Sequence, residues 1–185
     1  MTHASDTSPT AGKFYHLLSD QVRNEFTASQ QYIAIAVWFD SHDLPELASH
    51  FYAQSVEERN HAMMLVQWML DRDMPVVIPS VGEVINEFAN IVEPIQLALS
   101  QEHAVTEQIK ALFGAARAEF DYLGEQFMLW FLKEQVEEIA SITTLLTIAQ
   151  RAGDDWFDVE TYLARESLNA SVPDADAPSA AGGAL

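Results

Sequence analysis

Glycine and proline, the residues that most often interrupt helices, are few in this chain, which has seven of each among 185 residues. Four stretches of about 28 residues contain almost none of either, and their apolar residues recur at the spacing of one helical face. At 1.5 Å per residue, a helix of that length extends about 42 Å. The sequence therefore predicts four long helices, over about 13–40, 43–71, 90–119 and 121–150.

Several of the predicted helix ends carry residues that suit them. Asp43 is expected to cap the second helix, with Pro45 in the first turn, where the missing N–H costs nothing. Asp121 is expected to cap the fourth helix, and Gly153 suits its C-terminal end. A short fifth helix is predicted over 156–166.

Residues 73–91 separate the second and third helices and differ from them in composition. Pro75, Pro79 and Gly82 interrupt a helix, and the Val-Val-Ile run before Pro79 favours extended backbone. A segment of this length crosses a bundle from end to end, so that the helices it joins run parallel. We therefore predict an all-α fold, a four-helix bundle with a long crossover between helices two and three and a short fifth helix.

The two ends of the chain differ from its middle. Residues 1–12 are polar and lack the apolar core of a signal peptide. Residues 167–185 are rich in Ala, Pro, Ser, Asp and Gly. We predict a flexible N-terminal tail over 1–12, one folded domain over 13–166 and a disordered C-terminal tail over 167–185.

The formal net charge of −19 and the absence of cysteine exclude several classes of function. Nucleic acids and anionic membranes bind basic surfaces, so neither is an expected partner. Without cysteine the chain forms no disulfide, thiolate zinc site or iron–sulfur cluster. No apolar run is long enough to span a bilayer, and we expect a soluble cytoplasmic protein. The acidic surface serves solubility and also attracts cations.

Each predicted long helix carries a metal-capable side chain on its apolar face, near the midpoint. These residues are Glu25, Glu58, Glu102, and the pair Gln135 and Glu138. Buried carboxylates are unfavourable unless they are paired, protonated or bound to metal. The chain has only nine Lys and Arg residues against 28 acidic ones. Divalent cations between the helices would balance the buried charge, so we predict a metal site.

The strongest local signal is the sequence Glu58-Arg59-Asn60-His61. Its i, i+3 spacing places a carboxylate and an imidazole on one helical face. With carboxylates from the other helices, this pattern is typical of di-metal sites in four-helix bundles. Oxygen ligands with one imidazole favour iron or manganese over structural zinc.

A second set of acidic residues adjoins the first, and it consists of Glu57, Glu134 and Glu137 together with Glu138. Such a run is usually a solvated charged face. The alternative is a further cation site beside the di-metal pair.

Four separate segments resemble the non-haem bacterial ferritins, most closely the actinobacterial type. They are NEFTASQQY (24–32), VEERNHAMML (56–65), SQEHAVTEQI (100–109) and LWFLKEQVEE (129–138). The resemblance covers about residues 13–166 and includes every predicted long helix. It implies a ferritin-like fold, iron storage and detoxification, and ferroxidase activity that oxidises Fe(II) to Fe(III) with O2 or H2O2.

The resemblance also implies a role for individual residues. Glu25, Glu58 and His61 would bind one iron, and Glu58 would bridge to a second iron held by Glu102 and Glu138. Gln135 would touch the metal site or bound oxygen. The third iron site would comprise Glu57, Glu134, Glu137 and Glu138. Tyr32 would donate an electron during oxidation, whereas core packing is the favoured interpretation of the neighbouring aromatic residue, Trp130.

The family likeness further implies a homo-oligomer, a hollow shell of twenty-four subunits that encloses a ferric oxide mineral. Haem is not expected, because the haem-bearing relatives have a methionine where this chain has Arg59, and a second E-x-x-H where it has Gln135 and Glu138. Two alternatives remain open on the sequence: a di-iron redox enzyme without storage, such as a peroxide reductase, and a metal-free helical interaction module.

Overall fold

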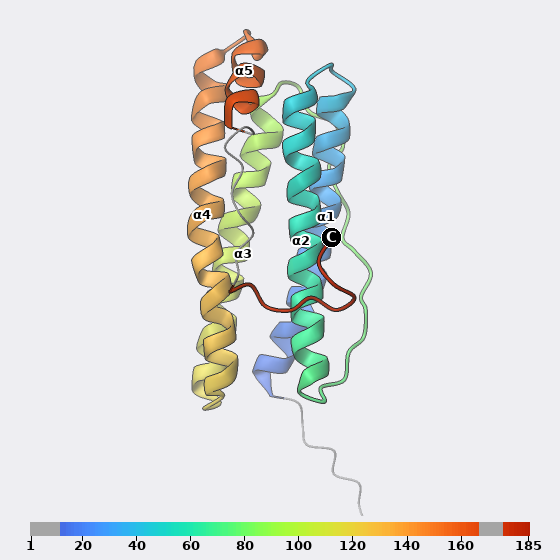
Figure 1. The fold of residues 1–185 in the computed structure, drawn as a ribbon, viewed down its shortest axis with the longest axis vertical. Coiled ribbons are helices and arrows are strands. Elements are labelled where there is room, and N and C mark those ends of the chain that lie inside the picture. The colour runs from blue at the N-terminus through green and yellow to red at the C-terminus, as the bar shows by residue number, and fades with distance from the viewer. Residues whose placement is uncertain (1–11, 167–175) are drawn as a thin grey trace, which may run out of the picture.

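The computed structural model describes residues 12–166 and 176–185. Four long helices form a bundle: α1 (Lys13–Asp40), α2 (Pro45–Asp71), α3 (Val92–Ala118) and α4 (Tyr122–Ala152). A short helix, α5 (Trp156–Glu166), lies across the end of the bundle where α1 passes into α2 (Figure 1). The described ranges contain no strand, and the all-α fold class predicted from the sequence is confirmed.

The crossover between α2 and α3 runs along the whole length of the bundle, so that α2 and α3 point the same way (Figure 1). It is extended, and α1 supplies hydrogen-bond partners for its main chain. Gln31 Nε2 donates to the carbonyl oxygen of Ile85 at 2.7 Å, and Ile85 N donates to Gln31 Oε1 at 2.7 Å. Gly82 N donates to Thr27 Oγ1 at 3.0 Å. These bonds hold the crossover against the bundle.

The helix ends agree with the sequence prediction except at the start of α2. Asp121 caps α4 and accepts a hydrogen bond from the Gly124 N–H at 3.0 Å, and Gly153 ends it with a φ of 59°. Asp43 was the wrong cap for α2. Its φ is 58°, in the left-handed region, and Leu44 occupies the capping position without a side-chain hydrogen bond.

The cap of α2 comes instead from α5. Glu160 Oε1 accepts from Leu47 N and Glu160 Oε2 accepts from Glu46 N, both at 2.9 Å. A carboxylate at a helix N-terminus satisfies unpaired N–H groups and interacts favourably with the helix dipole. Glu160 therefore joins α5 to the bundle through two hydrogen bonds, whose partners are 113 and 114 residues away in the sequence.

The bundle has two apolar layers along its axis. One layer contains Tyr32, Phe39, Phe51 and Ile142, and the other contains Leu18, Leu65 and Phe131. On every long helix, the metal-capable residues lie between the parts that contribute to these two layers. Among the described helices, none combines the length and apolarity needed to cross a membrane.

The last ten residues lie across α2 near its middle (Figure 1). Ala181 is buried, and its N–H donates to the carbonyl oxygen of Met63 at 3.0 Å. Leu185 N donates to Asn60 Oδ1 at 3.2 Å, and Asn60 Nδ2 donates to Leu185 O at 3.5 Å. The sequence predicted disorder over 167–185; residues 176–185 are instead placed by these contacts. Residues 1–11 and 167–175 of the two predicted tails lie outside the described residues.

Candidate metal centre

The four long helices bring their polar mid-face residues together at one level of the bundle. All six are buried, with exposed fractions between 1% and 8%, and they are Glu25, Glu58, His61, Glu102, Gln135 and Glu138. The helical spacing explains this burial, because each residue shares a face with the apolar residues of the two flanking layers. The centre thus lies inside the core rather than in a surface cleft.

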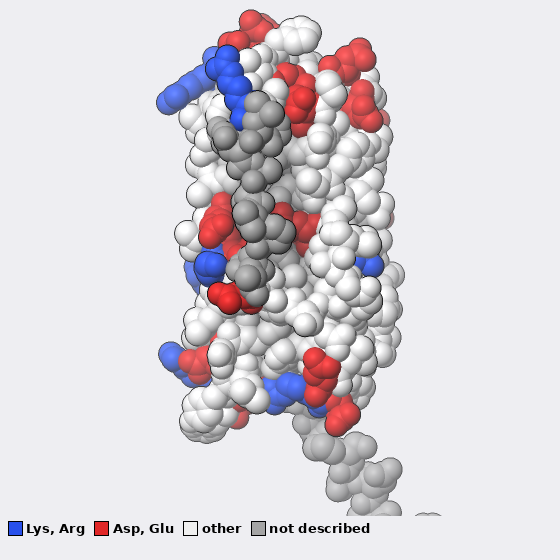
Figure 2. Space-filling view, viewed as in Figure 1, with Lys and Arg blue, Asp and Glu red and all other residues white. Residues whose placement is uncertain are grey.

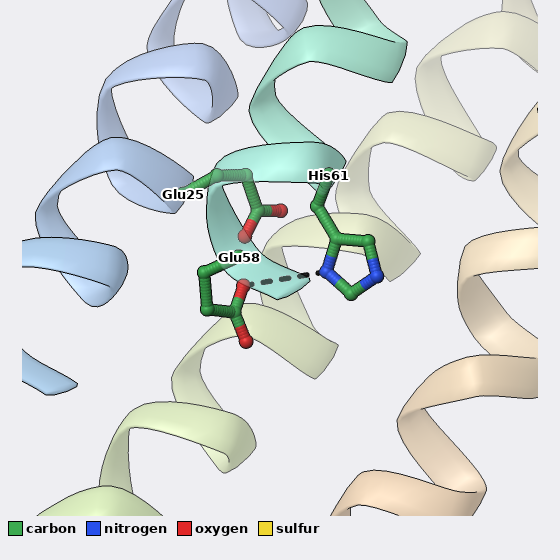
Figure 3. A group of neighbouring side chains, drawn as sticks. All are labelled: Glu25, Glu58 and His61. Atoms are coloured by element: carbon green, nitrogen blue, oxygen red, sulfur yellow. Dashed lines mark hydrogen bonds and ion pairs between the residues drawn. The ribbon is translucent and has the colours of Figure 1, made fainter. Parts of the chain in front are cut away.

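Glu25, Glu58 and His61 form one group of possible metal ligands in the centre (Figure 3). One ligand atom from each lies within 4.8 Å of the others, and His61 Nδ1 is 3.3 Å from Glu58 Oε2. Gln21 Nε2 donates to Glu25 Oε1 at 2.8 Å. The second oxygen, Glu25 Oε2, is buried and has no hydrogen-bond partner among the described residues. A cation could be bound at this oxygen.

Glu102 of α3 completes its hydrogen bonds with side chains of α1 and α4. The hydroxyl of Tyr32 donates to Glu102 Oε1. Gln135 Nε2 donates to Glu102 Oε2 at 3.2 Å. Tyr32 itself is fully buried, with its ring centroid 5.7 Å from that of Phe51. Both oxygens of this carboxylate are therefore held in a fixed direction.

The concentration of carboxylates disfavours their ionised forms in the absence of metal. Burial, followed by the neighbouring Glu58, raises the pKa of Glu25 well above its usual value. Burial and the charge of Glu102 do the same to the pKa of Glu58. Burial, with Glu57 and Glu102, raises the pKa of Glu138 to about 9. A bound cation reverses this effect, because it favours the charged form of each ligand.

A second group of ligand atoms lies beside the first and shares His61 with it. Glu57, His61 and Glu134 each offer an atom within 4.8 Å of the others, and both carboxylates are half-buried. Partial burial raises the pKa of Glu134, as do the charges of Glu137 and Glu57, while His61 lowers it. Glu137 is exposed on α4 and does not belong to this group of three.

The aromatic residues around His61 are part of the core packing. The ring centroids of Trp130 and Phe131 each lie 5.7 Å from that of the imidazole, in edge-on contact. Trp130 is half-buried. Their apolar surfaces surround the imidazole and limit the directions in which it can turn.

Sequence reasoning did not identify two residues that contact the centre. Gln21 lies four residues before Glu25, and Thr106 lies four residues after Glu102. The signal that could have found them is this spacing, which places each on the same helical face as a predicted ligand.

The set of donor atoms fits iron. It consists of carboxylate oxygens and one imidazole nitrogen, with no thiolate, a combination that suits iron or manganese. The charge of the protein surface also bears on cation binding. Figure 2 shows acidic side chains at mid-height and near both ends of the face on which α2 and α4 lie, with basic side chains beside them and wide uncharged areas between. The formal net charge of −19 favours cations over anions near the protein.

Comparison with known proteins shows matches over most of the chain. The family model described as a ferritin-like domain matches residues 15–152. Ferritin BfrB of Mycolicibacterium smegmatis is 61% identical over 173 residues, which are 94% of this chain and 95% of that protein. Ferritin BfrB of Mycobacterium tuberculosis is 56% identical over the same shares. A bacterial non-heme ferritin of Staphylococcus aureus is 35% identical over 75% of this chain and 83% of its own length.

Solved structures show the same architecture. A humanized archaeal ferritin superposes with a TM-score of 0.83 at 24% identity, covering 89% of this chain and 99% of the other. At this identity the match shows a shared fold only. An open pore ferritin from the hyperthermophilic archaeon Archaeoglobus fulgidus superposes with a TM-score of 0.81 at 26% identity, covering 85% and 98%.

Proposed function

This chain belongs to the ferritin family, and we propose that it stores iron by oxidising Fe(II) to Fe(III) with O2 or H2O2 and depositing ferric oxide inside a protein shell. The observation that carries the proposal is the buried group of Glu25, Glu58 and His61, whose ligand atoms lie within 4.8 Å of one another. Oxidation at such a group requires Fe(II) as substrate. We expect Fe(II) there because the chain belongs to the ferritin family.

In this proposal, two Fe(II) ions bind side by side at the level of the buried carboxylates. Glu25, Glu58 and His61 hold one, Glu58 bridges, and Glu102 and Glu138 hold the other. Gln135 lies beside the second ion and acts on it through its hydrogen bond to Glu102. The free buried oxygen of Glu25 and the imidazole beside Glu58 support the first ion position.

The carboxylates favour oxidation because Fe(III) gains more than Fe(II) from anionic ligands in a medium of low dielectric constant. Two Fe(II) ions give two electrons, which reduce O2 to H2O2 or H2O2 to water, with two protons taken up. Buried carboxyl groups with raised pKa values release protons as the cations bind. The centre is thereby both the binding site and a local source of protons.

We further propose that Glu57 and Glu134, with Glu137 and Glu138 beside them, form a third iron site. The half-buried cluster of Glu57, His61 and Glu134 supports its position. A hollow shell of twenty-four subunits in the cytoplasm completes the proposal, with the net charge of −19 providing acidic surface on which ferric oxide nucleates.

The experiment that tests this function is stopped-flow measurement of aerobic Fe(II) oxidation by the wild-type protein and by Glu58→Ala. We expect the variant to lose at least about tenfold in initial rate, since the bridging ligand is gone. Glu107→Ala is the matched control, because Glu107 is an exposed glutamate on α3 that pairs with Lys110 in i, i+3 spacing. Equal rates for Glu58→Ala and wild type would contradict the site assignment.

Assembly is tested separately, by electron microscopy of the wild-type protein after iron loading in air. Hollow shells with dense cores support storage. A dimer that oxidises Fe(II) without forming a core would instead identify a di-iron redox enzyme.

A further inference from the structure

A chain of hydrogen bonds leads from Thr106 to the centre. Thr106 lies on α3, and its Oγ1 is 2.6 Å from Gln135 Oε1 on α4. Gln135 Nε2 in turn donates to Glu102 Oε2 at 3.2 Å. We propose that Thr106 is a positioning residue that orients the amide of Gln135 so that its NH2 group faces Glu102. This inference rests on the function proposed above.

The hydroxyl of Thr106 has one proton and two acceptors within reach. The main-chain oxygen of Glu102 lies 2.8 Å away, one helical turn earlier. That oxygen already accepts the N–H of Thr106 in the regular hydrogen bonding of α3. Gln135 Oε1 is nearer, at 2.6 Å, and is buried inside the bundle. We assign the proton to Gln135 Oε1, the nearer of the two acceptors.

The reversed amide orientation is unfavourable at Gln135. It would place Oε1 against the carboxylate oxygen of Glu102, so that two acceptors would face each other without a proton between them. An unsatisfied buried acceptor is unfavourable in a protein interior. A hydroxyl can both donate and accept a hydrogen bond, whereas an ionised carboxylate can only accept one. Glu102 thus selects the orientation of the amide, and the Thr106 hydroxyl holds it by donating to Gln135 Oε1.

The consequence concerns the second metal position. Oε1 is the atom of a glutamine amide that ligates a cation, and here it accepts a hydrogen bond from the Thr106 hydroxyl while the NH2 group faces Glu102. Gln135 then acts as a donor, and with Tyr32 it fixes both oxygens of Glu102. Fixing the direction of a ligand before the cation arrives is what hydrogen-bonded neighbours of metal ligands do.

The test compares Thr106→Val, which removes the hydroxyl at nearly constant volume, with Thr106→Ser, which keeps it. We expect Thr106→Val to lower the maximal rate of Fe(II) oxidation by about tenfold, with Thr106→Ser close to wild type. Thr144→Val is the matched control, because the Thr144 hydroxyl makes the same bond to a carbonyl four residues earlier, at an exposed position of α4. If Thr106→Val does not fold, Thr106→Ala removes the hydroxyl without adding a methyl group.

A double-mutant cycle shows whether Thr106 acts through Gln135. On a Gln135→Ala background, adding Thr106→Val is expected to cause no further loss. A Thr106→Val rate equal to that of wild type, or an equal loss on both backgrounds, overturns the inference.

A second readout does not depend on oxidation. Anaerobic Co(II) titration reports ligand geometry through the visible absorption bands of the bound ion. We expect an altered spectrum for Thr106→Val and a wild-type spectrum for Thr106→Ser, and identical spectra overturn the inference. Wild-type protein that binds Co(II) without oxidising Fe(II) would refute the proposed function alone.

Discussion

The hydroxyl of Tyr32 on α1 donates a hydrogen bond to the carboxylate of Glu102 on α3. Both side chains are about 1% exposed, so the bond lies in the interior of the bundle. Burial and the charges of Glu102 and Glu58 raise the pKa of Tyr32 well above its usual value, and the phenol stays protonated. A protonated phenol bonded to Glu102, a predicted ligand of the centre, is suitably placed to give up an electron with its proton.

Replacing Tyr32 by phenylalanine tests this placement. We expect Tyr32→Phe to abolish a tyrosyl radical signal in electron paramagnetic resonance of samples frozen shortly after Fe(II) and O2 are mixed. The metal-free variant should also lose about 1.5–3 kcal/mol of stability, the usual contribution of a hydrogen bond to a charged group. Tyr52→Phe is the control, since Tyr52 is partly exposed and its hydroxyl lies 3.4 Å from Asp40. An undiminished radical in Tyr32→Phe would contradict the role.

The buried carboxylates should make the metal-free protein less stable as the pH rises. Between the usual pKa of 4.5 and about 9, the folded state holds a proton on Glu138 that the unfolded state has lost. The contribution of Glu138 to stability is therefore fully present below pH 4.5. It is lost as the pH rises from there through about 9, the pKa in the folded state. Glu25 and Glu58 act in the same direction.

Thermal unfolding in the presence of a chelator, from about pH 7 to 9, measures this dependence. His50 acts in the opposite direction, because burial lowers its pKa from 6.5 to about 4, and its contribution changes below this range. Glu138→Gln should flatten the decline, whereas Glu107→Gln, an exposed substitution, should not. A rise in melting temperature over this range in the wild type would contradict the origin assigned to the shifts.

The second acidic cluster should bind a cation of its own. Glu134→Gln removes one of the three ligand atoms that lie within 4.8 Å of one another, and we expect it to reduce the number of Fe(II) ions bound per subunit. Glu137→Gln should have a smaller effect, because Glu137 is exposed and outside that group. Anaerobic titration calorimetry measures both. Equal losses from the two substitutions would show that the site is centred nearer to Glu137.

Glu160 should hold α5 against the bundle. Glu160→Gln keeps the length of the side chain but leaves one acceptor for the two N–H groups of Glu46 and Leu47. We expect a loss of about 1–2 kcal/mol in stability and faster hydrogen exchange in α5, because the cap of α2 is weakened. Asp158→Asn, an exposed change on the same helix, is the control. Unchanged exchange in α5 would contradict this role.

Helical periodicity was sufficient to predict the bundle and most of its centre. Glu25, Glu58 and Glu102 lie at midpoints of apolar faces, and helices of similar length packed side by side bring midpoints to one level. The Glu58-x-x-His61 spacing further fixed the imidazole beside its carboxylate. The same reasoning does not establish the bound metal, and the ligand roles remain predictions.

Contacts between distant parts of the chain were beyond sequence reasoning. Asp43 has the residue type of a helix cap, yet Glu160 caps α2 from another helix, which only the tertiary fold brings near. The composition of the C-terminal segment predicts disorder, but the Ala181 N–H donates a hydrogen bond to the carbonyl oxygen of Met63 on α2. Local patterns carry no information about such pairings.

The most direct measurement of the central claim is anomalous diffraction at the iron edge from crystals soaked anaerobically in a ferrous salt. We predict two strong peaks per subunit between the four long helices, one bound by Glu25, Glu58 and His61 and the other by Glu58, Glu102 and Glu138. Peaks confined to the outer surface, with the buried carboxylates bonded only to one another and to protein donors, would contradict the account.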